Sequence, residues 1–277
     1  MKKIAFSFLV AFAAASFTIT SCKKKDDTTT VTVDCNTSTL ALTAAVSGST
    51  ITVTGSGGTT PYSYSKDGVN FQSSNVFTDV AYGAYTISIK DASCTKTTAI
   101  TVNSVTDSRD GKIYKLVQIG TQVWFGENLN YKGTLSAGTE DCYNSLADSC
   151  TKYGALYDWS GANVACPNGW HLSTDAEWQT LEAYLGMSAT DLSATGQRGT
   201  DQGTKLQEGG SSGFNAKMSG FQNTSFSGAG GYTNFWSSTG SSGTYYRRQL
   251  GVGVSTISRG LYPDVTTTKC CVRCLKN

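Results

Sequence analysis

The only histidine of the chain, His171, is the side chain best suited to acid–base chemistry near neutral pH. It lies in the stretch CPNGWHLSTDAEWQTLEAYLG, residues 166–186, beside a cysteine and two tryptophans. A Ser–His or Cys–His site needs this imidazole within hydrogen-bonding reach of a hydroxyl or a thiol. No G-x-S-x-G motif and no papain-like cysteine motif accompanies it. We therefore expect His171 to be structural, and we predict no catalytic residue and no enzyme activity.

The nine cysteines offer lipidation, disulfide bonding, metal binding or redox chemistry. Cys22 is a lipidation candidate, as described below, and without it the number of cysteines is even. An even number of cysteines in an exported chain favours disulfides. Zinc needs several ligands at metal spacing, yet Cys271 and Cys274 form the one C-x-x-C and His171 is the one imidazole. We predict no metal and no cofactor. The remaining eight are Cys35, Cys94, Cys142, Cys150, Cys166, Cys270, Cys271 and Cys274.

Residues 1–21 predict a bacterial lipoprotein signal peptide. Lys2 and Lys3 precede the apolar run IAFSFLVAFAAASFTI, which is shorter than the roughly 20 residues that a membrane-spanning helix needs. The run ends in I-T-S-C, which resembles a lipobox and implies cleavage before Cys22 and acylation of its sulfur. A plain secretory signal is the alternative. Two or three acyl chains would hold the protein on a membrane, since each buried CH2 contributes about 0.8 kcal/mol.

The mature start, residues 22–34, is polar and predicts a flexible tether. Its basic and then acidic residues resemble those of surface-directed lipoproteins from Bacteroidetes-type bacteria. We expect a lipid anchor in the cell outer membrane and a surface-exposed protein, with a periplasm-facing orientation as the alternative.

Composition and charge exclude a nucleic-acid partner. The chain has 22 basic and 20 acidic residues, and its formal net charge of +2 equals the contribution of Lys2 and Lys3. A neutral mature chain has no field that attracts a polyphosphate. With 30 glycines and only 15% charged residues, the composition favours short strands and turns over long helices.

Residues 35–103 predict an antiparallel β-sandwich, because short alternating or β-branched runs are separated by glycine-containing turns. Cys35 precedes the first run and Cys94 precedes the last, so a bond between them would tie the ends together. The runs SGGTTPYSYSKDGVNF and FTDVAYGAYTISIKDASC resemble the Ig-like repeats of bacterial surface adhesins. This resemblance implies a spacer or stalk.

The polar stretch SVTDSRDGK, residues 104–112, marks the boundary to a second module that holds all five tryptophans. Its first run, IYKLVQIGTQVWFGENLNY, predicts two strands around Gly120 and Thr121. Residues 155–165 predict a helix that Pro167 and Gly169 end. The sequence T-D-A-E at Thr174 is a capping box, and it predicts a second helix that packs a tryptophan and two leucines and ends near Gly186.

The order of the motifs matches a known family. The runs are DSRDGKIYKLVQIGTQVWFGENLNY, CYNSLADSCTKYGALYDWSGANVACPNGWHLSTDAEWQTLEAYLG, GFNAKMSGF, FWSST and KCCVRCLKN. Over residues 106–277 they resemble the Fibrobacter succinogenes major paralogous domain, which is similar to C-type-lectin-like and formylglycine-generating-enzyme-like folds. The resemblance implies an α+β domain at residues 104–277 with two helices and a mostly antiparallel sheet, and no known reaction. The fold class is then an all-β Ig-like sandwich followed by an α+β C-type-lectin-like domain.

The cysteines can be compared with this family. In the family the V-R-C cysteine, here Cys274, recurs, which suggests a bond to Cys166. Cys142 and Cys150 bracket the loop YNSLADS, where a disulfide would stabilise by roughly 2–3 kcal/mol. Cys270 and Cys271 depart from the family pattern, and a bond between adjacent cysteines would be strained. Redox chemistry of the formylglycine-generating type, or an intermolecular bond, stays open for them.

A lectin-type calcium site is not expected. Lectins of this fold use a Glu-Pro-Asn or similar triplet, and Asn-Asp after a tryptophan. Here Trp236 is followed by Ser-Ser-Thr, and none of the three prolines lies in such a triplet.

The remaining candidate for function is a binding surface. Residues 186–234 are rich in glycine and serine, and in lectin-like folds this region forms the ligand-facing loops. We predict a lipid-anchored surface binding or adhesion protein without catalysis, with carbohydrate as a candidate ligand. A structural envelope component and a cysteine-dependent oxidase are the alternatives. Side chains that could stack on or hydrogen-bond a glycan, or else be ordinary strand and loop residues, are Asn223, Tyr232, Asn234, Tyr245, Tyr246 and Arg247.

Overall fold

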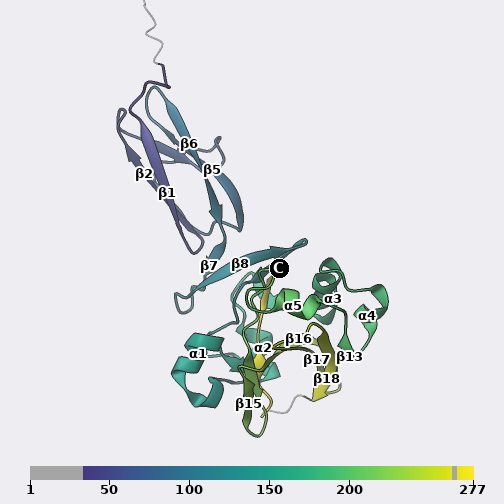
Figure 1. Ribbon diagram of the computed structural model, residues 1–277. Coiled ribbons are helices and arrows are strands. Elements are labelled where there is room, and N and C mark those ends of the chain that lie inside the picture. Colours follow the sequence, from purple (N-terminus) through teal and green to yellow (C-terminus); the bar gives the residue numbers. More distant parts are fainter. Residues whose placement is uncertain (1–33, 264–266) are drawn as a thin grey trace, which may run out of the picture.

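The computed structural model describes residues 34–263 and 267–277, and most of these lie in or between β-strands (Figure 1). The predicted signal peptide, the lipidation site Cys22 and all but the last residue of the tether lie outside the described residues. Within the described part of the chain, no helix is long and apolar enough to cross a membrane.

The N-terminal part, here called the sandwich, consists of two three-stranded sheets that share one apolar core. Ile51 and Val53 from one sheet and Ile87 and Ile89 from the other are fully buried between them. The strands of the first sheet are β1 (Ala41–Ser47), β2 (Thr50–Ser56) and β4 (Val76–Phe77). Those of the second are β3 (Ser63–Ser65), β5 (Gly83–Lys90) and β6 (Thr95–Val102).

One continuous stretch of chain joins the sandwich to the rest of the molecule, which we call the C-terminal unit (β7 to β20). Only Asn103 separates β6 from β7 (Ser104–Thr106), so the predicted boundary stretch 104–112 begins with a strand. β7 pairs with β8 (Ile113–Ile119) at the junction seen in Figure 1. The Ser104 hydroxyl donates to the Gly48 carbonyl at 3.1 Å, and the Leu116 amide donates to the Asn103 carbonyl at 2.7 Å.

The first sheet of the C-terminal unit has five strands in the order β12-β20-β9-β8-β7. The hairpin predicted around Gly120 and Thr121 is confirmed, since β8 and β9 pair across that turn. The last strand, β20, lies in this sheet between β9 and the edge strand β12. The remaining bounds are β9 (Gln122–Phe125), β12 (Trp170–Leu172) and β20 (Cys274–Lys276).

The second sheet has nine strands along the path β10-β11-β19-β16-β17-β18-β13, with β14 and β15 beside β16. Its long central strands are β16 (Tyr232–Ser241), β17 (Thr244–Gly251) and β18 (Ile257–Pro263). The shorter strands are β10 (Glu140–Asp141), β11 (Leu156–Tyr157), β13 (Gly196–Arg198), β14 (Ser219–Gln222), β15 (Phe226–Ala229) and β19 (Cys270–Cys271).

Of the two helices predicted from the sequence, one is confirmed and one is partly wrong. The capping box is confirmed, because Thr174 and Glu177 exchange both hydrogen bonds at the start of α3 (Asp175–Tyr184). The helix predicted for residues 155–165 is partly wrong, because Leu156 and Tyr157 form β11 between β10 and β19. The helix α2 (Trp159–Ala165) begins only after Asp158, whose side chain accepts from the Gly161 amide.

The segment 186–234 is more regular than predicted. It holds α4 (Ala189–Ser193), α5 (Gln202–Leu206) and the strands β13, β14 and β15, so the prediction of a long irregular loop region is wrong. These elements are too short to show a hydrophobic period in the sequence. The loop between Cys142 and Cys150 likewise contains a single 3-10 turn (Tyr143–Ser145) and the start of α1 (Ala147–Tyr153).

Large aromatic side chains fill the C-terminal unit, as the position of the tryptophans predicts. Trp124, Trp178 and Trp236 are fully buried, and Trp124 packs against Trp178 with ring centroids 5.2 Å apart. Two apolar clusters lie on opposite faces of the nine-stranded sheet: Phe235 and Leu250 belong to the one beneath α3, and Trp236 and Cys270 belong to the other.

Candidate functional site

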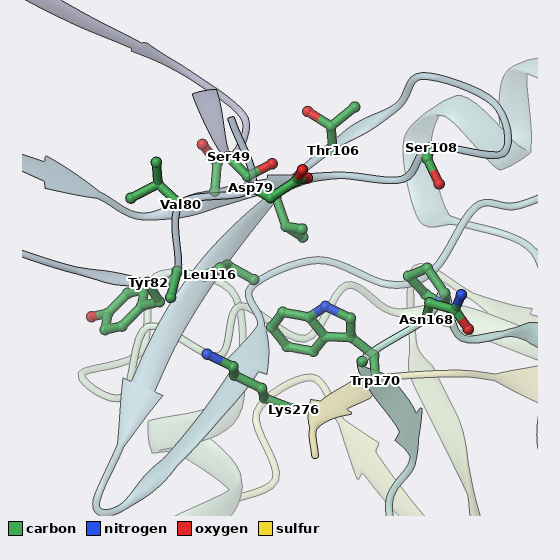
Figure 2. A pocket seen from close by; sticks show the side chains of 15 residues that line it. Ser49, Asp79, Val80, Tyr82, Thr106, Ser108, Leu116, Asn168, Trp170 and Lys276 are labelled. Carbon is green, nitrogen blue, oxygen red and sulfur yellow. The ribbon is translucent and has the colours of Figure 1, made fainter. Parts of the chain in front are cut away.

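A cleft of about 340 Å³ lies at the seam between the sandwich and the C-terminal unit. Ser49, Asp79 and Tyr82 reach it from turns of the sandwich, and Asn168, Trp170 and Lys276 reach it from the C-terminal unit (Figure 2). Thr106 and Ser108 line it from the connection between the two. A concave site at a boundary between two units, with an aromatic side chain and several polar groups, has the general composition of a ligand pocket.

Trp170 is the central aromatic side chain of the cleft, and Figure 2 shows its indole in the middle of the view. It is held by β12 and by an edge-to-face contact with Phe125, whose ring centroid is 4.7 Å away. The turn before it needs Gly169, which adopts a φ of +81°, and the Trp170 amide closes that turn on the Pro167 carbonyl at 3.0 Å. The indole is therefore fixed on one side and half-buried, so part of it faces the cleft.

The charged and amide side chains of the cleft have no partners in the described part of the chain, whereas the Ser104 hydroxyl, which also lines it, donates to the Gly48 carbonyl. Lys276 is the cross-strand neighbour of Trp170, yet its ammonium makes no ion pair there. The Asp79 carboxylate and the Asn168 amide also make no hydrogen bond with a described residue. An exposed cation, a carboxylate, an amide and hydroxyls thus surround an indole and remain available to a ligand.

This arrangement suits recognition of a polyhydroxylated ring. The indole offers a flat apolar surface with an N–H at its edge, and the surrounding groups offer both donors and acceptors. His171 does not line the cleft and is held by two other contacts. The His171 Nε2 atom lies 3.0 Å from both Glu177 carboxylate oxygens, and Nδ1 lies 2.8 Å from Asn277 Oδ1.

The capping box and His171 form one small polar unit. Burial alone would raise the pKa of Glu177, but hydrogen bonds from Thr174 and His171 outweigh it and lower the pKa. The ionised carboxylate then accepts from the Thr174 amide at 2.8 Å and orients the imidazole. These contacts support the structural interpretation of His171.

None of the six predicted ligand residues lines the seam cleft. Asn223 is exposed beside the β14–β15 turn, while the other five lie on β16 and β17. Asn234 is fully buried. Tyr246 lies on the α3 side of the sheet over Arg259, whose guanidinium carbon is 4.0 Å from the ring centroid. Tyr232, Asn234, Tyr245 and Arg247 share the opposite face, because pairing places Asn234 beside Gln249 and Trp236 beside Arg247.

Of the eight cysteines in the described residues, six form disulfides and two are free. The bonds are Cys35–Cys94, Cys142–Cys150 and Cys166–Cys274. Cys270 and Cys271 are free and fully buried, and burial raises the pKa of Cys270 to about 12. Burial also raises the pKa of Cys271, although Ser219 and Thr233 hydrogen-bond its sulfur. Neither thiol has the thiolate character or the access of a reactive cysteine. No group of three or more His, Cys, Asp or Glu side chains within residues 34–263 and 267–277 is placed to hold a metal.

Sequence reasoning assigned Trp170 only to the tryptophan-rich second module and did not single out Asp79, Asn168 or Lys276. Asp79 lies in a sandwich turn with a φ of +53°, and Lys276 is the second-last residue of the chain. A local pattern cannot show that these residues meet at one seam. The polar boundary stretch at 104–112 was the one indication, since ligand sites often lie where two units join.

Comparison with known proteins supplies the family. The model of the Fibrobacter succinogenes major domain matches residues 117–276, more than half of the chain, and the chain belongs to this family. A search of curated proteins found no match. A search of solved structures also found none.

Proposed function

We propose that this Fibrobacter succinogenes major domain protein is a lipid-anchored surface protein that binds carbohydrate in the seam cleft, without catalysis. The observation that carries the proposal is the half-buried indole of Trp170 beside the side chains of Asp79, Asn168 and Lys276, which lack partners in the described residues. The cleft is large enough for one or two sugar rings. Stacking on an indole combined with hydrogen bonds from mixed donors and acceptors recognises a sugar ring without any need for a metal.

The fold assignments belong to the same proposal. We take the sandwich as an Ig-like spacer, supported by its two sheets, shared core and end-to-end disulfide Cys35–Cys94. We take the C-terminal unit as C-type-lectin-like, supported by two helices that flank β12 and by the bond from the end of α2 to β20. A spacer that raises a binding unit above a membrane suits an adhesion protein.

The membrane anchor can be tested separately. Cys22 acylation predicts that the protein incorporates labelled palmitate and sediments with the outer membrane, and that Cys22→Ser abolishes both. A protein that is released without acylation would support the plain secretory signal. Protease treatment of intact cells then distinguishes a surface-exposed protein, which is degraded, from a periplasm-facing one.

The binding proposal is tested with a glycan array, followed by calorimetry on the glycans that bind. Lys276→Ala and Asp79→Ala are the main variants, because neither side chain has a partner in the described fold. We expect each to weaken binding about tenfold, and Trp170→Ala to abolish it. Tyr184→Ala is the matched control, since this aromatic ring is 66% exposed and lies outside the cleft.

Two results would count against the cleft. Saturable binding that none of the cleft variants weakens would place the ligand elsewhere. The absence of binding to any glycan would favour a structural component of the envelope. The cysteine-dependent oxidase is disfavoured by the burial of Cys270 and Cys271 and by their raised pKa values.

A further inference from the structure

A second feature of the C-terminal unit lies on the nine-stranded sheet, away from the seam. Arg247 of β17 is only 8% exposed, and its guanidinium carbon lies 3.0 Å from the Tyr262 ring centroid and 5.6 Å from that of Phe221. Its Nε atom is buried without a hydrogen-bond partner, and no carboxylate of a described residue pairs with the group. The Arg247 side chain hydrogen-bonds the Cys270 thiol, which is neutral because burial raises its pKa.

The other buried arginines of this unit have oxygen partners. Arg198 and Arg248 bond to Glu182, Arg259 bonds to Asp175, and Arg273 bonds to main-chain carbonyls and Asn128. Burying a cation without an anion is costly, and natural proteins rarely keep such a group without a use. Arg247 is therefore the exception that needs an explanation.

A second unpartnered group lies next to it on the same face. Asn234 of β16 is fully buried, and neither its side-chain oxygen nor its nitrogen has a hydrogen-bond partner in the described residues. The register pairs Trp236 with Arg247 and Asn234 with Gln249, so Asn234 and Arg247 are diagonal neighbours. A guanidinium and an amide side by side offer N–H donors in the arrangement that binds a carboxylate.

Aromatic rings surround this pair. Tyr245 precedes Arg247 by two positions and stacks on Trp159, with ring centroids 3.5 Å apart and an angle of 14° between the planes. On the other side Tyr232 lies 5.9 Å from Phe221, centroid to centroid. The residue of β18 that pairs with Arg247 is Gly260, and a Cβ there would lie 3.0 Å from the Tyr262 ring that covers the guanidinium. The glycine thus leaves room for the Tyr262 ring over the guanidinium.

We propose that this face, defined by Asn234, Tyr245, Arg247 and Tyr262, binds the carboxylate of an acidic sugar such as a uronic acid. The carboxylate pairs with the outer edge of Arg247, and the Tyr245–Trp159 stack supports the sugar ring. A nucleic acid is disfavoured, because the chain is nearly neutral and this face offers a single cation. The site shares no residue with the seam cleft, so it does not rest on the proposed function.

The test compares two probes by calorimetry on the full-length protein with Cys22→Ser. Trigalacturonate carries the carboxylates, and the corresponding neutral galactose trimer does not. We expect the acid to bind at least tenfold more tightly than the neutral trimer, and the difference to shrink as salt is added. Arg247→Met should remove the preference, whereas Arg247→Lys should keep part of it because the charge remains.

The variants separate this site from the cleft. Trp170→Ala should leave the preference for the acid intact, even if it abolishes binding of neutral glycans. Tyr245→Ala provides a second variant if Arg247→Met does not fold. It should lower the affinity for trigalacturonate at least fivefold. Equal affinity for both trimers, or no binding of the acid, would overturn the proposal. The proposal would also be overturned if Arg247→Met bound trigalacturonate with the affinity of the parent protein.

Discussion

Glu182 is the centre of a buried ionic cluster that holds α3 on the nine-stranded sheet. Its carboxylate lies 2.7 Å from the nearest guanidinium nitrogens of both Arg198 and Arg248, and it is fully buried. Asp175, in the first turn of the same helix, pairs with Arg248 and Arg259 at 2.7 Å each. Because the cluster contains three guanidinium groups and only two carboxylates, each carboxylate pairs with two buried cations and the cluster keeps an excess positive charge.

The first prediction follows from this imbalance. Glu182→Gln keeps the shape of the side chain but leaves the buried Arg198 without an anion and Arg248 with Asp175 alone, and we expect it to lower the free energy of unfolding by about 3–5 kcal/mol. Asp201→Asn is the control, since Asp201 is 54% exposed and pairs with Lys205 at the surface, and its loss should cost about 1 kcal/mol or less. Urea denaturation monitored by tryptophan fluorescence measures the free energy of unfolding of both variants. Equal losses would show that the cluster has no special energetic weight.

The two free thiols lead to a second prediction. In a Cys22→Ser protein they are the unpaired cysteines of the chain, and both are fully buried. We expect maleimide to label neither thiol within minutes at pH 8 while the protein is folded, and to label two per chain in urea without reductant. Rapid labelling of the folded protein would mean that the thiols reach solvent, and would revive the redox alternative.

The same burial predicts how stability depends on alkaline pH. The fold raises the pKa of the Cys270 thiol from its ordinary value of 9.0 to about 12. Between these values the unfolded chain has lost a proton that the folded chain keeps, so stability is fully present below pH 9 and falls as pH rises toward 12. Cys270→Ala together with Cys271→Ala should make this fall shallower. Part of the fall should remain, because burial also raises the pKa of Tyr157; an unchanged slope would contradict the assignment.

At the scale of single elements, the disulfides differ in the length of chain that each closes. Cys166–Cys274 spans 108 residues and ties the end of α2 to β20, whereas Cys142–Cys150 spans 8 residues. A longer loop loses more freedom in the unfolded chain when it is closed. We expect replacement of both cysteines by serine to cost roughly 4–5 kcal/mol for the long bond and roughly 2–3 kcal/mol for the short one. Chemical denaturation of the two double variants tests the order, and a larger loss for the short bond would contradict it.

Elements set by neighbouring residues were predictable, whereas elements set by distant partners were not. The start of α3 needs only Thr174 and Glu177, and the β8–β9 hairpin needs only its turn. In contrast, Leu156 and Tyr157 form a strand because Cys271 and Cys270 pair with them from more than a hundred residues away. A helical spacing of apolar residues cannot reveal such a partner.

The same limit applies to the sites. Asp175 could be recognised as a favourable charge at a helix N-terminus, but its partners Arg248 and Arg259 lie 73 and 84 residues further along. Tyr232, Asn234, Tyr245 and Arg247 were named from residue type, and the strand alternation of β16 and β17 explains why they share one face. The seam cleft combines Asp79 with Trp170 from different parts of the chain, so it required the structure.

At the scale of the whole molecule, the cleft exists only if the sandwich and the C-terminal unit keep their relative placement. The single residue between β6 and β7 and the hydrogen bonds to Asn103 and Gly48 leave little freedom at the joint. Ser49 and Asp79 on one wall and Trp170 and Lys276 on the other are brought together by this joint (Figure 2). The proposed binding in the cleft therefore depends on a rigid joint.

The last prediction concerns the freedom of this joint. Insertion of Gly-Ser-Gly-Ser-Gly between Val102 and Asn103 keeps β7 paired with β8 but releases the sandwich, because such a linker behaves as a flexible coil. We expect glycan affinity at the cleft to fall at least tenfold, since the two walls no longer meet in one geometry, while circular dichroism and the thermal unfolding of each unit stay unchanged. The same insertion placed at the exposed Gly243 turn between β16 and β17 is the control and should leave cleft affinity intact. If the variant with the insertion at the joint binds the glycan as tightly as the parent protein, the ligand contacts one wall alone and the seam is not the site.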